Sequence, residues 1–160
     1  MRANWNGAKA AGLLRGAYQY FRPAESPLDQ ADALVRVLRM YGAGELPPVL
    51  DIETLDGRTL PDVAAAAKIW IDRVRSELGV EPLVYTNYGM WRWRPATELG
   101  TQLLWLAHYT TQCPSIPGPW VRWTFWQYTD GGRVPGIGGS VDLDVFDGTL
   151  DDLRHRFGAR

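Results

Sequence analysis

Apolar residues recur every three or four positions in three segments of the chain, a spacing typical of helices with one buried face. The first runs from Ser26 to Gly42 and the second from Pro61 to Gly79, and each ends at a glycine that can stop a helix. The third runs from Thr149 to Phe157, where Thr149 and Asp152 can cap the first turn. Residues Asn4 to Ala11 have the pattern of a helix end that leads into a strand. The expected buried faces consist of Leu28, Ala31, Leu34, Val35, Leu38 and Tyr41 in the first, Val63, Ala67, Trp70, Ile71, Val74 and Leu78 in the second, and Leu150, Leu153 and Phe157 in the third.

Short apolar runs between these segments predict strands. Four of them are apolar on both faces, as expected for parallel strands that are covered on both sides: Leu14–Phe21, Val49–Glu53, Leu83–Asn87 and Leu103–Tyr109. Two later runs, Val121–Tyr128 and Val141–Phe146, alternate apolar and polar residues instead. Only the turn-rich segment Thr129–Ser140 separates these two, so we expect them to pair antiparallel. The order β-α-β-α-β-β-β-β-α predicts an α/β fold.

Composition narrows the class of protein. The chain has 160 residues, 46% of them hydrophobic and 22% charged, which predicts one globular domain over residues 1–160. The longest apolar run, Leu103–Ala107, is far shorter than the ~20 residues that span a bilayer, so no membrane contact is expected. No apolar stretch follows the N-terminus, so no signal peptide is expected in this chain. A net charge of −1 makes nucleic acid an unsuitable partner.

The residues needed for metal, disulfide or serine–histidine chemistry are scarce. A single cysteine, Cys113, excludes an internal disulfide, and two histidines are too few for the usual zinc sites, so we expect no metal and no cofactor. His108 is predicted inside a buried strand and His155 on the outer side of the last helix, and neither has a nucleophile partner. Eight tryptophans and seven tyrosines exceed what a core of this size usually holds. The tryptophans and tyrosines that do not fit in the core would suit contact with the flat apolar faces of a ligand such as a sugar ring.

Asp51 and Glu53 are the strongest candidates for chemistry. They are two residues apart at the end of a predicted parallel strand, so both side chains leave one face with Cα atoms ~6–7 Å apart. Two like charges this close cannot both ionise cheaply, so one pKa rises and a general acid becomes available. Glycoside hydrolysis uses such a pair of carboxyl groups. Helix capping and ion pairing remain equally good explanations for the two residues taken alone.

Asp142 and Asp144 offer further carboxylates on one face of the last predicted strand. If that strand closes a barrel beside the first strands, Asp142 points into the site, while Asp144, nearer the strand end, bonds a loop backbone. For each aspartate alone, bonding to a loop is the favoured interpretation.

Six segments, in this order, resemble successive motifs of glycoside hydrolase family 25, the Chalaropsis-type lysozymes: residues 16–23 (GAYQYFRP), 48–53 (PVLDIE), 84–87 (VYTN), 104–109 (LWLAHY), 125–129 (FWQYT) and 134–144 (VPGIGGSVDLD). The resemblance implies a modified TIM-like (β/α)5(β)3 barrel with antiparallel closing strands. It also implies an N-acetylmuramidase that hydrolyses the β-1,4 bond between N-acetylmuramic acid and N-acetylglucosamine of peptidoglycan. Such an enzyme works outside the cell or is delivered to the cell wall by a phage.

Residue roles follow from the same resemblance. Glu53 matches the family's general acid, Asp51 the carboxylate that assists it, and Asp142 the last-strand aspartate of the same cluster. The positions that line the substrate groove in the family match Tyr18, Tyr85, Trp105, Tyr109, Trp126 and Gln127.

The chain departs from the family pattern in two respects. Gln19 stands where the family usually has histidine, which predicts tuned rather than lost activity. The family's first two strands, one with an aspartate and one with a lysine motif, have no match, so we expect a fragment or a truncated gene model. A partner chain or a self-pairing dimer could also supply strands to the exposed edges. The alternative function is a catalytically impaired, glycan-binding remnant of the same fold.

Overall fold

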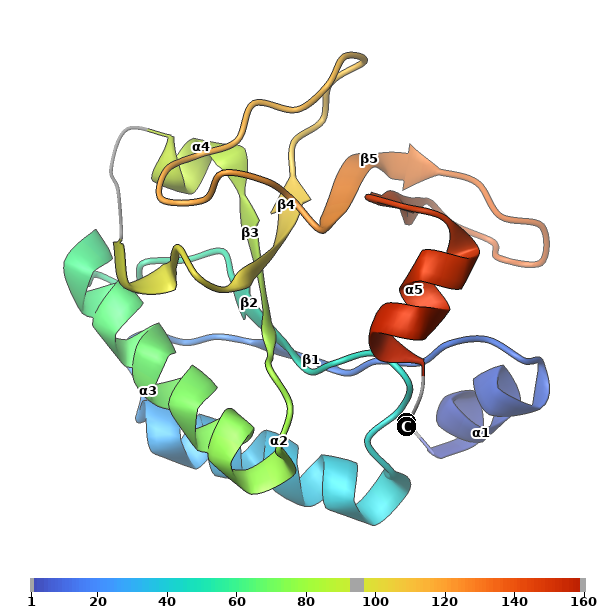
Figure 1. The fold of residues 1–160 in the computed structure, drawn as a ribbon, viewed down its shortest axis with the longest axis horizontal. Coiled ribbons are helices and arrows are strands. Elements are labelled where there is room, and N and C mark those ends of the chain that lie inside the picture. Colours follow the sequence, from blue (N-terminus) through green and yellow to red (C-terminus); the bar gives the residue numbers. More distant parts are fainter. Residues whose placement is uncertain (1, 93–96, 159–160) are drawn as a thin grey trace.

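The computed structural model describes residues 2–92 and 97–158, which form a curled sheet with the two longest helices, Pro27–Tyr41 and Leu60–Leu78, on its convex side (Figure 1). The strands are β1 (Tyr18–Tyr20), β2 (Val49–Ile52), β3 (Leu83–Asn87), β4 (Leu103–Ala107), β5 (Phe125–Gly132) and β6 (Val141–Phe146). The helices are α1 (Arg2–Ala10), α2 (Pro27–Tyr41), α3 (Leu60–Leu78), α4 (Tyr88–Trp91), the 3-10 turn η1 (Thr97–Leu99) and α5 (Leu150–Phe157).

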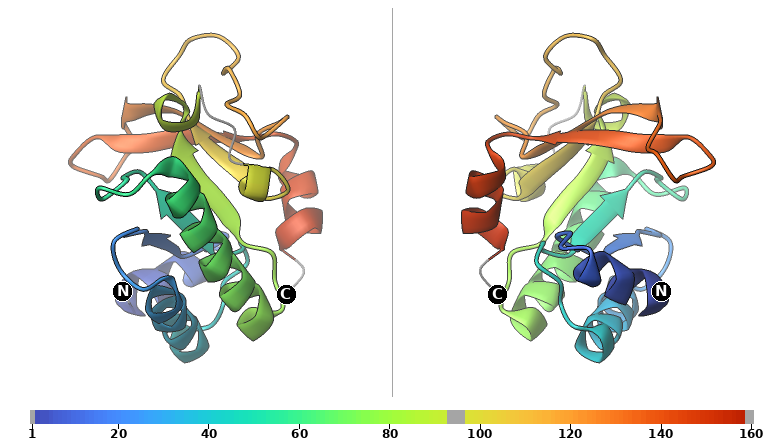
Figure 2. Two further views of the ribbon diagram at one scale, coloured as in Figure 1. Left: turned by 90° about the vertical axis from the view of Figure 1, so that its left-hand side faces the viewer. Right: turned by 90° about the vertical axis from the view of Figure 1, so that its right-hand side faces the viewer.

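The six strands lie in sequence order, and β1 to β5 run parallel. Only β6 reverses, pairing antiparallel with β5 as the sequence predicts. Within the described residues β1 pairs with β2 alone and β6 with β5 alone, so the sheet is an open half-barrel (Figure 2). The pairing of the parallel strands aligns their carboxyl ends along one rim, where α/β proteins place their sites.

Helices α2 and α3 pack against each other and cover the convex side of β1 to β3 (Figure 2). Their ends confirm the predicted signals. Ser26 Oγ accepts from the Asp29 amide at the start of α2, and α3 ends at the left-handed Gly79. A capping box between Thr59 and Asp62 starts α3 at Leu60, so this helix begins one residue before the prediction.

Alternation along β2 explains how the fold positions the predicted pair of carboxyl groups. Leu50 and Ile52 point to the helix side and are fully buried in the hydrophobic core. Val49 and Asp51 therefore point to the concave side, and both line a cavity there. Because each buried aliphatic side chain contributes roughly 1.5–3 kcal/mol, a one-residue slip of this strand would be costly.

Two strand predictions are wrong at their N-terminal ends. The first strand begins at Tyr18 rather than Leu14, because the Arg15 carbonyl bonds the amides of Glu45 and Leu46 in a loop instead of a ladder. Phe125, not Val121, begins β5, and Val121 is 88% exposed. This strand instead continues to Gly132, because the hairpin with β6 extends into the segment predicted as a turn.

Smaller differences concern exposure and short elements. Leu28 and Leu150 are exposed, at 49% and 55%, because each lies in the first turn of its helix, beyond the edge of the core. The N-terminal helix prediction is confirmed by α1, and the last helix keeps its Thr149–Asp152 capping box. The short α4 and η1 carry no amphipathic pattern and were not predicted. No helix within residues 2–92 and 97–158 has the length and apolarity needed to cross a membrane.

Candidate active site

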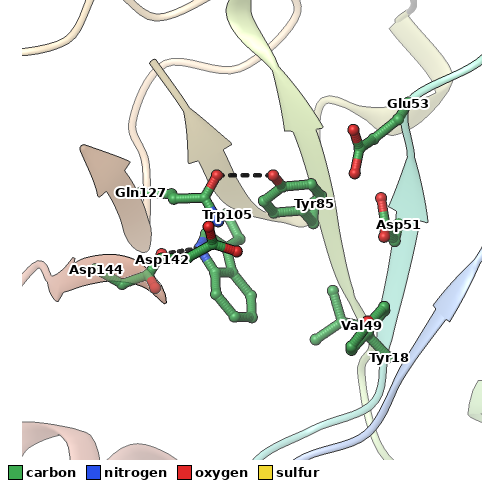
Figure 3. A pocket seen from close by; sticks show the side chains of 9 residues that line it. All are labelled: Tyr18, Val49, Asp51, Glu53, Tyr85, Trp105, Gln127, Asp142 and Asp144. Atoms are coloured by element: carbon green, nitrogen blue, oxygen red, sulfur yellow. Dashed lines mark hydrogen bonds between the residues drawn. The ribbon is translucent and has the colours of Figure 1, made fainter. Parts of the chain in front are cut away.

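A cavity of about 230 Å³ opens on the concave side of the sheet (Figure 3). Its walls come from every strand, from β1 to β6. It is lined by Tyr18, Val49, Asp51, Glu53, Tyr85, Trp105, Gln127, Asp142 and Asp144. The fold therefore brings together most of the residues that the sequence nominated.

Asp51 and Glu53 share one side of this cavity (Figure 3). Asp51 is only 6% exposed and its Oδ1 has no hydrogen-bond partner, whereas Glu53, just beyond the end of β2, is exposed. Burial, then the negative charge of Glu53 and a hydrogen bond with it, raise the pKa of Asp51 to about 7. The pair consequently holds one proton near neutral pH, as a general acid requires.

Asp142 and Asp144 face this pair from β6 on the opposite side (Figure 3). The sequence predicted that Asp144 bonds a loop backbone, and this prediction is wrong. Asp144 Oδ1 instead accepts a 2.7 Å hydrogen bond from the indole N–H of Trp105, because both side chains point to the concave side. Burial raises the pKa of Asp144, the indole hydrogen bond lowers it, and the charge of Asp142 raises it again.

Aromatic side chains form the floor of the cavity between the Asp51–Glu53 pair and the Asp142–Asp144 pair. The ring of Trp105 packs edge to face on Tyr85, with centroids 5.6 Å apart, and at a tilt on Phe125 at 5.5 Å. Val49, which was not among the residues predicted from the sequence to form the site, completes this floor. The alternation that places Asp51 inward places Val49 inward as well, so the signal was present.

Gln127 joins the aromatic floor to the cavity wall. Its Oε1 accepts hydrogen bonds of 2.9 Å from the phenols of both Tyr85 and Tyr109. Burial, with the charge of Glu53 second, raises the pKa of the Tyr85 phenol, so this group remains a donor. Tyr109 itself lines a neighbouring cavity that also contains Glu53 and Tyr85.

Three other residues discussed from the sequence do not line the cavity of the four carboxyl groups: Trp126, His108 and Gln19. Trp126 lies in a second hollow with Tyr109 and Tyr128, and its indole donates to the His108 carbonyl at 2.7 Å. His108 follows β4 rather than lying within it, because the strand ends at Ala107, and its ring stacks on Tyr88. Gln19 faces the helices, where its Oε1 accepts from the Trp70 indole at 3.0 Å.

The chemistry available in the cavity is that of carboxyl groups and neutral hydrogen bonds. In the part of the chain that the structure describes, no three histidine, cysteine or acidic side chains are arranged to hold a metal ion. A carboxyl group with a raised pKa beside further carboxyl groups suits the transfer of a proton to a leaving oxygen and the stabilisation of positive charge.

Known proteins resemble the chain over nearly its whole length. The uncharacterized protein YegX of Escherichia coli (strain K12) is 33% identical over 151 residues, which cover 94% of this chain and 54% of YegX. Lysozyme M1 of Streptomyces globisporus is 32% identical, with coverages of 94% and 55%. The chain thus spans about half the length of these curated relatives.

The fold also matches that of a solved structure. The bacterial lysozyme from Streptomyces coelicolor superposes with a TM-score of 0.82 at 30% identity, over 94% of this chain and 75% of the lysozyme chain. The model of the family described as glycosyl hydrolases family 25 matches residues 1–137, which include β1 to β5 and both members of the Asp51–Glu53 pair. The chain therefore belongs to glycosyl hydrolases family 25.

Proposed function

We propose that the chain is the greater part of a peptidoglycan muramidase, which hydrolyses the β-1,4 bond between N-acetylmuramic acid and N-acetylglucosamine. One observation carries this proposal: carboxyl groups from β2 and β6 face each other across a cavity floored by aromatic rings. Relatives named lysozyme M1 and N,O-diacetylmuramidase support the substrate class. The enzyme would act at the cell wall, outside the cell or after delivery by a phage.

Glu53 is the proposed general acid, because it is the exposed member of the pair and can receive the proton that the raised pKa of Asp51 keeps beside it. It donates this proton to the leaving glycosidic oxygen as the bond to the anomeric carbon breaks. The pair is then fully ionised, so Asp51 faces the positive charge that develops on the sugar and stabilises it. Asp142 adds a further negative charge from the opposite wall. Water completes the hydrolysis and returns a proton to Glu53.

The aromatic floor is the proposed binding surface for the sugar rings. Tyr18, Tyr85 and Trp105 line the cavity itself, and Tyr109 lies at its edge beside Glu53. Trp126 would contact the glycan only beyond Tyr109, where its hollow lies. For the fold, we propose that the half-barrel corresponds to the larger part of a (β/α)5(β)3 barrel, since β6 already runs antiparallel. We also propose that residues 1–160 form a single domain.

The decisive experiment replaces Glu53 with glutamine and measures the release of reducing ends from purified peptidoglycan. The Glu53→Gln protein should lose roughly 10²–10⁴-fold in rate, the usual contribution of a general acid, at an almost unchanged melting temperature. Glu25→Gln, at an exposed acid outside the cavity, is the matched control and should keep full activity. Equal activity in the two variants would exclude Glu53 as the acid.

A second candidate function is glycan binding without hydrolysis. The observation that favours it is the open sheet, whose β1 and β6 edges leave one side of the cavity without a wall in the described part of the chain. In that case the protein should bind purified peptidoglycan and release no reducing ends. Measurable reducing-end release that depends on Glu53 would exclude this function.

A further inference from the structure

Gln127 lies where hydrogen bonds from two neighbouring side chains restrict the orientation of its amide group. The side chain is 4% exposed and comes from β5, between the aromatic floor and the carboxylates of β6. Its carbonyl oxygen accepts from two phenols, Tyr85 on β3 and Tyr109 just after β4, each at 2.9 Å. A carbonyl oxygen has two lone pairs, so these two bonds occupy its full capacity as an acceptor.

The two phenols thereby fix the direction of the amide nitrogen. Burial raises the pKa of each phenol, so both keep the protons with which they donate to Gln127 Oε1. Because the oxygen of the amide faces both tyrosines, its Nε2 group points away from them. It donates no hydrogen bond to any residue in 2–92 or 97–158, and it is not among the enclosed polar atoms without partners. A ligand in the cavity can reach it.

Few other polar groups of the cavity are free to donate a hydrogen bond to a ligand, so this nitrogen has a role that they do not fill. The four carboxyl groups serve mainly as acceptors, and the proton that the raised pKa of Asp51 keeps in the cavity is the one that the reaction uses. The indole N–H of Trp105 is already bonded to Asp144, and the Tyr85 phenol to Gln127. Only Gln127 Nε2 and the exposed Tyr18 hydroxyl remain as neutral donors on this wall. A ligand oxygen that can only accept has few other partners.

We infer that Gln127 selects N-acetylated sugars by donating from Nε2 to the carbonyl oxygen of an acetamido group, with Tyr85 and Tyr109 as the positioning residues that hold the amide. An acetamido carbonyl only accepts, and it is repelled by carboxylates, so it matches this donor and no other feature of the wall except Tyr18. A hydroxyl in place of the acetamido group stops short of the position of the carbonyl oxygen. The inference rests on the proposed function to the extent that the ligand is an acetamido-sugar glycan.

Two neutral probes that differ only at this substituent test the inference. Chitotetraose carries an acetamido group on each sugar, and cellotetraose carries a hydroxyl at the same position. Titration calorimetry on the full chain should give a preference of roughly tenfold or more for chitotetraose, since a donor that a bound ligand covers and leaves without a partner weakens binding. A wild-type protein that binds neither probe, or both equally, would overturn the inference.

Two variants assign the preference to the amide and to its orientation. Gln127→Met keeps the volume and removes the donor, so the preference should fall to about twofold while the affinity for cellotetraose stays constant. The double variant Tyr85→Phe with Tyr109→Phe keeps Gln127 but frees its amide to turn, so the preference should fall there too. Tyr109→Phe alone leaves one phenol bond and should keep most of the preference. An unchanged preference in the double variant would overturn the positioning role.

The outcomes separate this inference from the proposed hydrolysis. If the chain prefers chitotetraose through Gln127 but releases no reducing ends from peptidoglycan, the binding role of Gln127 is supported and the muramidase function is excluded. If Gln127→Met cleaves peptidoglycan at the wild-type rate and keeps the same probe preference, the muramidase function is supported and the role of Gln127 is excluded. If Gln127→Met does not fold, the double phenylalanine variant alone decides, because it removes only two hydroxyl groups.

Discussion

The carboxyl group of Asp51 lies buried beside the exposed carboxyl group of Glu53, and the two together hold one proton near neutral pH. Burial is the first cause of the raised pKa of Asp51, and the charge of Glu53 is the second. The sequence predicted a shared site for these residues, and the structure adds which of them is enclosed. This difference in burial has consequences for stability as well as for catalysis.

Asp51→Asn should stabilise the protein at pH 8 and change its stability little at pH 4. The pKa of Asp51 in the folded state, about 7, lies above its unfolded value of 3.8. The contribution of the protonated carboxyl is therefore fully present below about pH 4 and lost as the pH rises through 7. Asparagine mimics the protonated form at every pH, so we expect a gain of about 1–2 kcal/mol at pH 8 in denaturant unfolding.

The same variant should lose reducing-end release, since it removes the negative charge that faces the sugar. Glu25→Gln serves as the control for a general change in net charge. A stability difference of equal size at pH 4 and pH 8 would show that packing, rather than the proton, separates Asp51→Asn from the wild type.

Thr86→Val should destabilise the fold by about 1–3 kcal/mol, although the two side chains have the same shape. The Thr86 hydroxyl is fully buried, donates to the Ile52 carbonyl at 2.7 Å and accepts from the Trp91 indole at 2.8 Å. Valine leaves both partners unsatisfied, next to the end of β2 from which Glu53 follows. Thr86→Ser keeps the hydroxyl and should lose less in urea unfolding. A smaller loss for valine than for serine would contradict this account.

Glu45→Gln should lower the unfolding free energy at pH 7 by about 1–2 kcal/mol. The Glu45 carboxylate accepts from Arg15 Nη2 at 2.7 Å, Nε at 3.0 Å and the backbone amide at 2.9 Å. These bonds, opposed in part by burial, lower the pKa of Glu45 to about 2. Because the folded pKa lies below the unfolded value of 4.5, this stability is present above about pH 4.5 and lost as the pH falls through 2. Thermal melts of both proteins from pH 2 to 7 should therefore converge at the acid end.

The sequence predicted those parts of the fold that local chemistry decides. Thr149 and Gly79 mark helix ends as predicted, because capping depends on residues within one turn. The inward face of β2 follows from alternation alone, so Asp51 and Val49 could be placed on one side. Val121 was misplaced because a short alternating run occurs in loops as well as in strands.

Contacts between strands could not be predicted, because they depend on register. The pairing of Gln127 with Tyr85 and Tyr109 joins β5 to β3 and to the segment after β4, and no spacing in the sequence encodes it. The direction of the Gln19 side chain, by contrast, could have been predicted. The tuned activity that the family pattern predicted for Gln19 stays a prediction, whereas the direction of its side chain, toward the Trp70 indole on the helix side, follows from alternation from Tyr18.

Asp144→Leu should weaken chitotetraose binding, because Asp144 holds the ring that forms the floor of the cavity. The Trp105 indole N–H donates to Asp144 at 2.7 Å, and its ring packs on Tyr85 and Phe125. Leucine removes the acceptor, whereas Asp144→Asn keeps an oxygen for the indole and loses only the charge. We expect a loss of roughly fivefold or more in affinity for leucine and about twofold for asparagine. The indole ¹⁵N–¹H resonance of Trp105, assigned through Trp105→Phe, should shift for leucine and stay near its place for asparagine. Equal losses of affinity in the two variants would mean that the charge of Asp144, and not its bond to Trp105, supports binding.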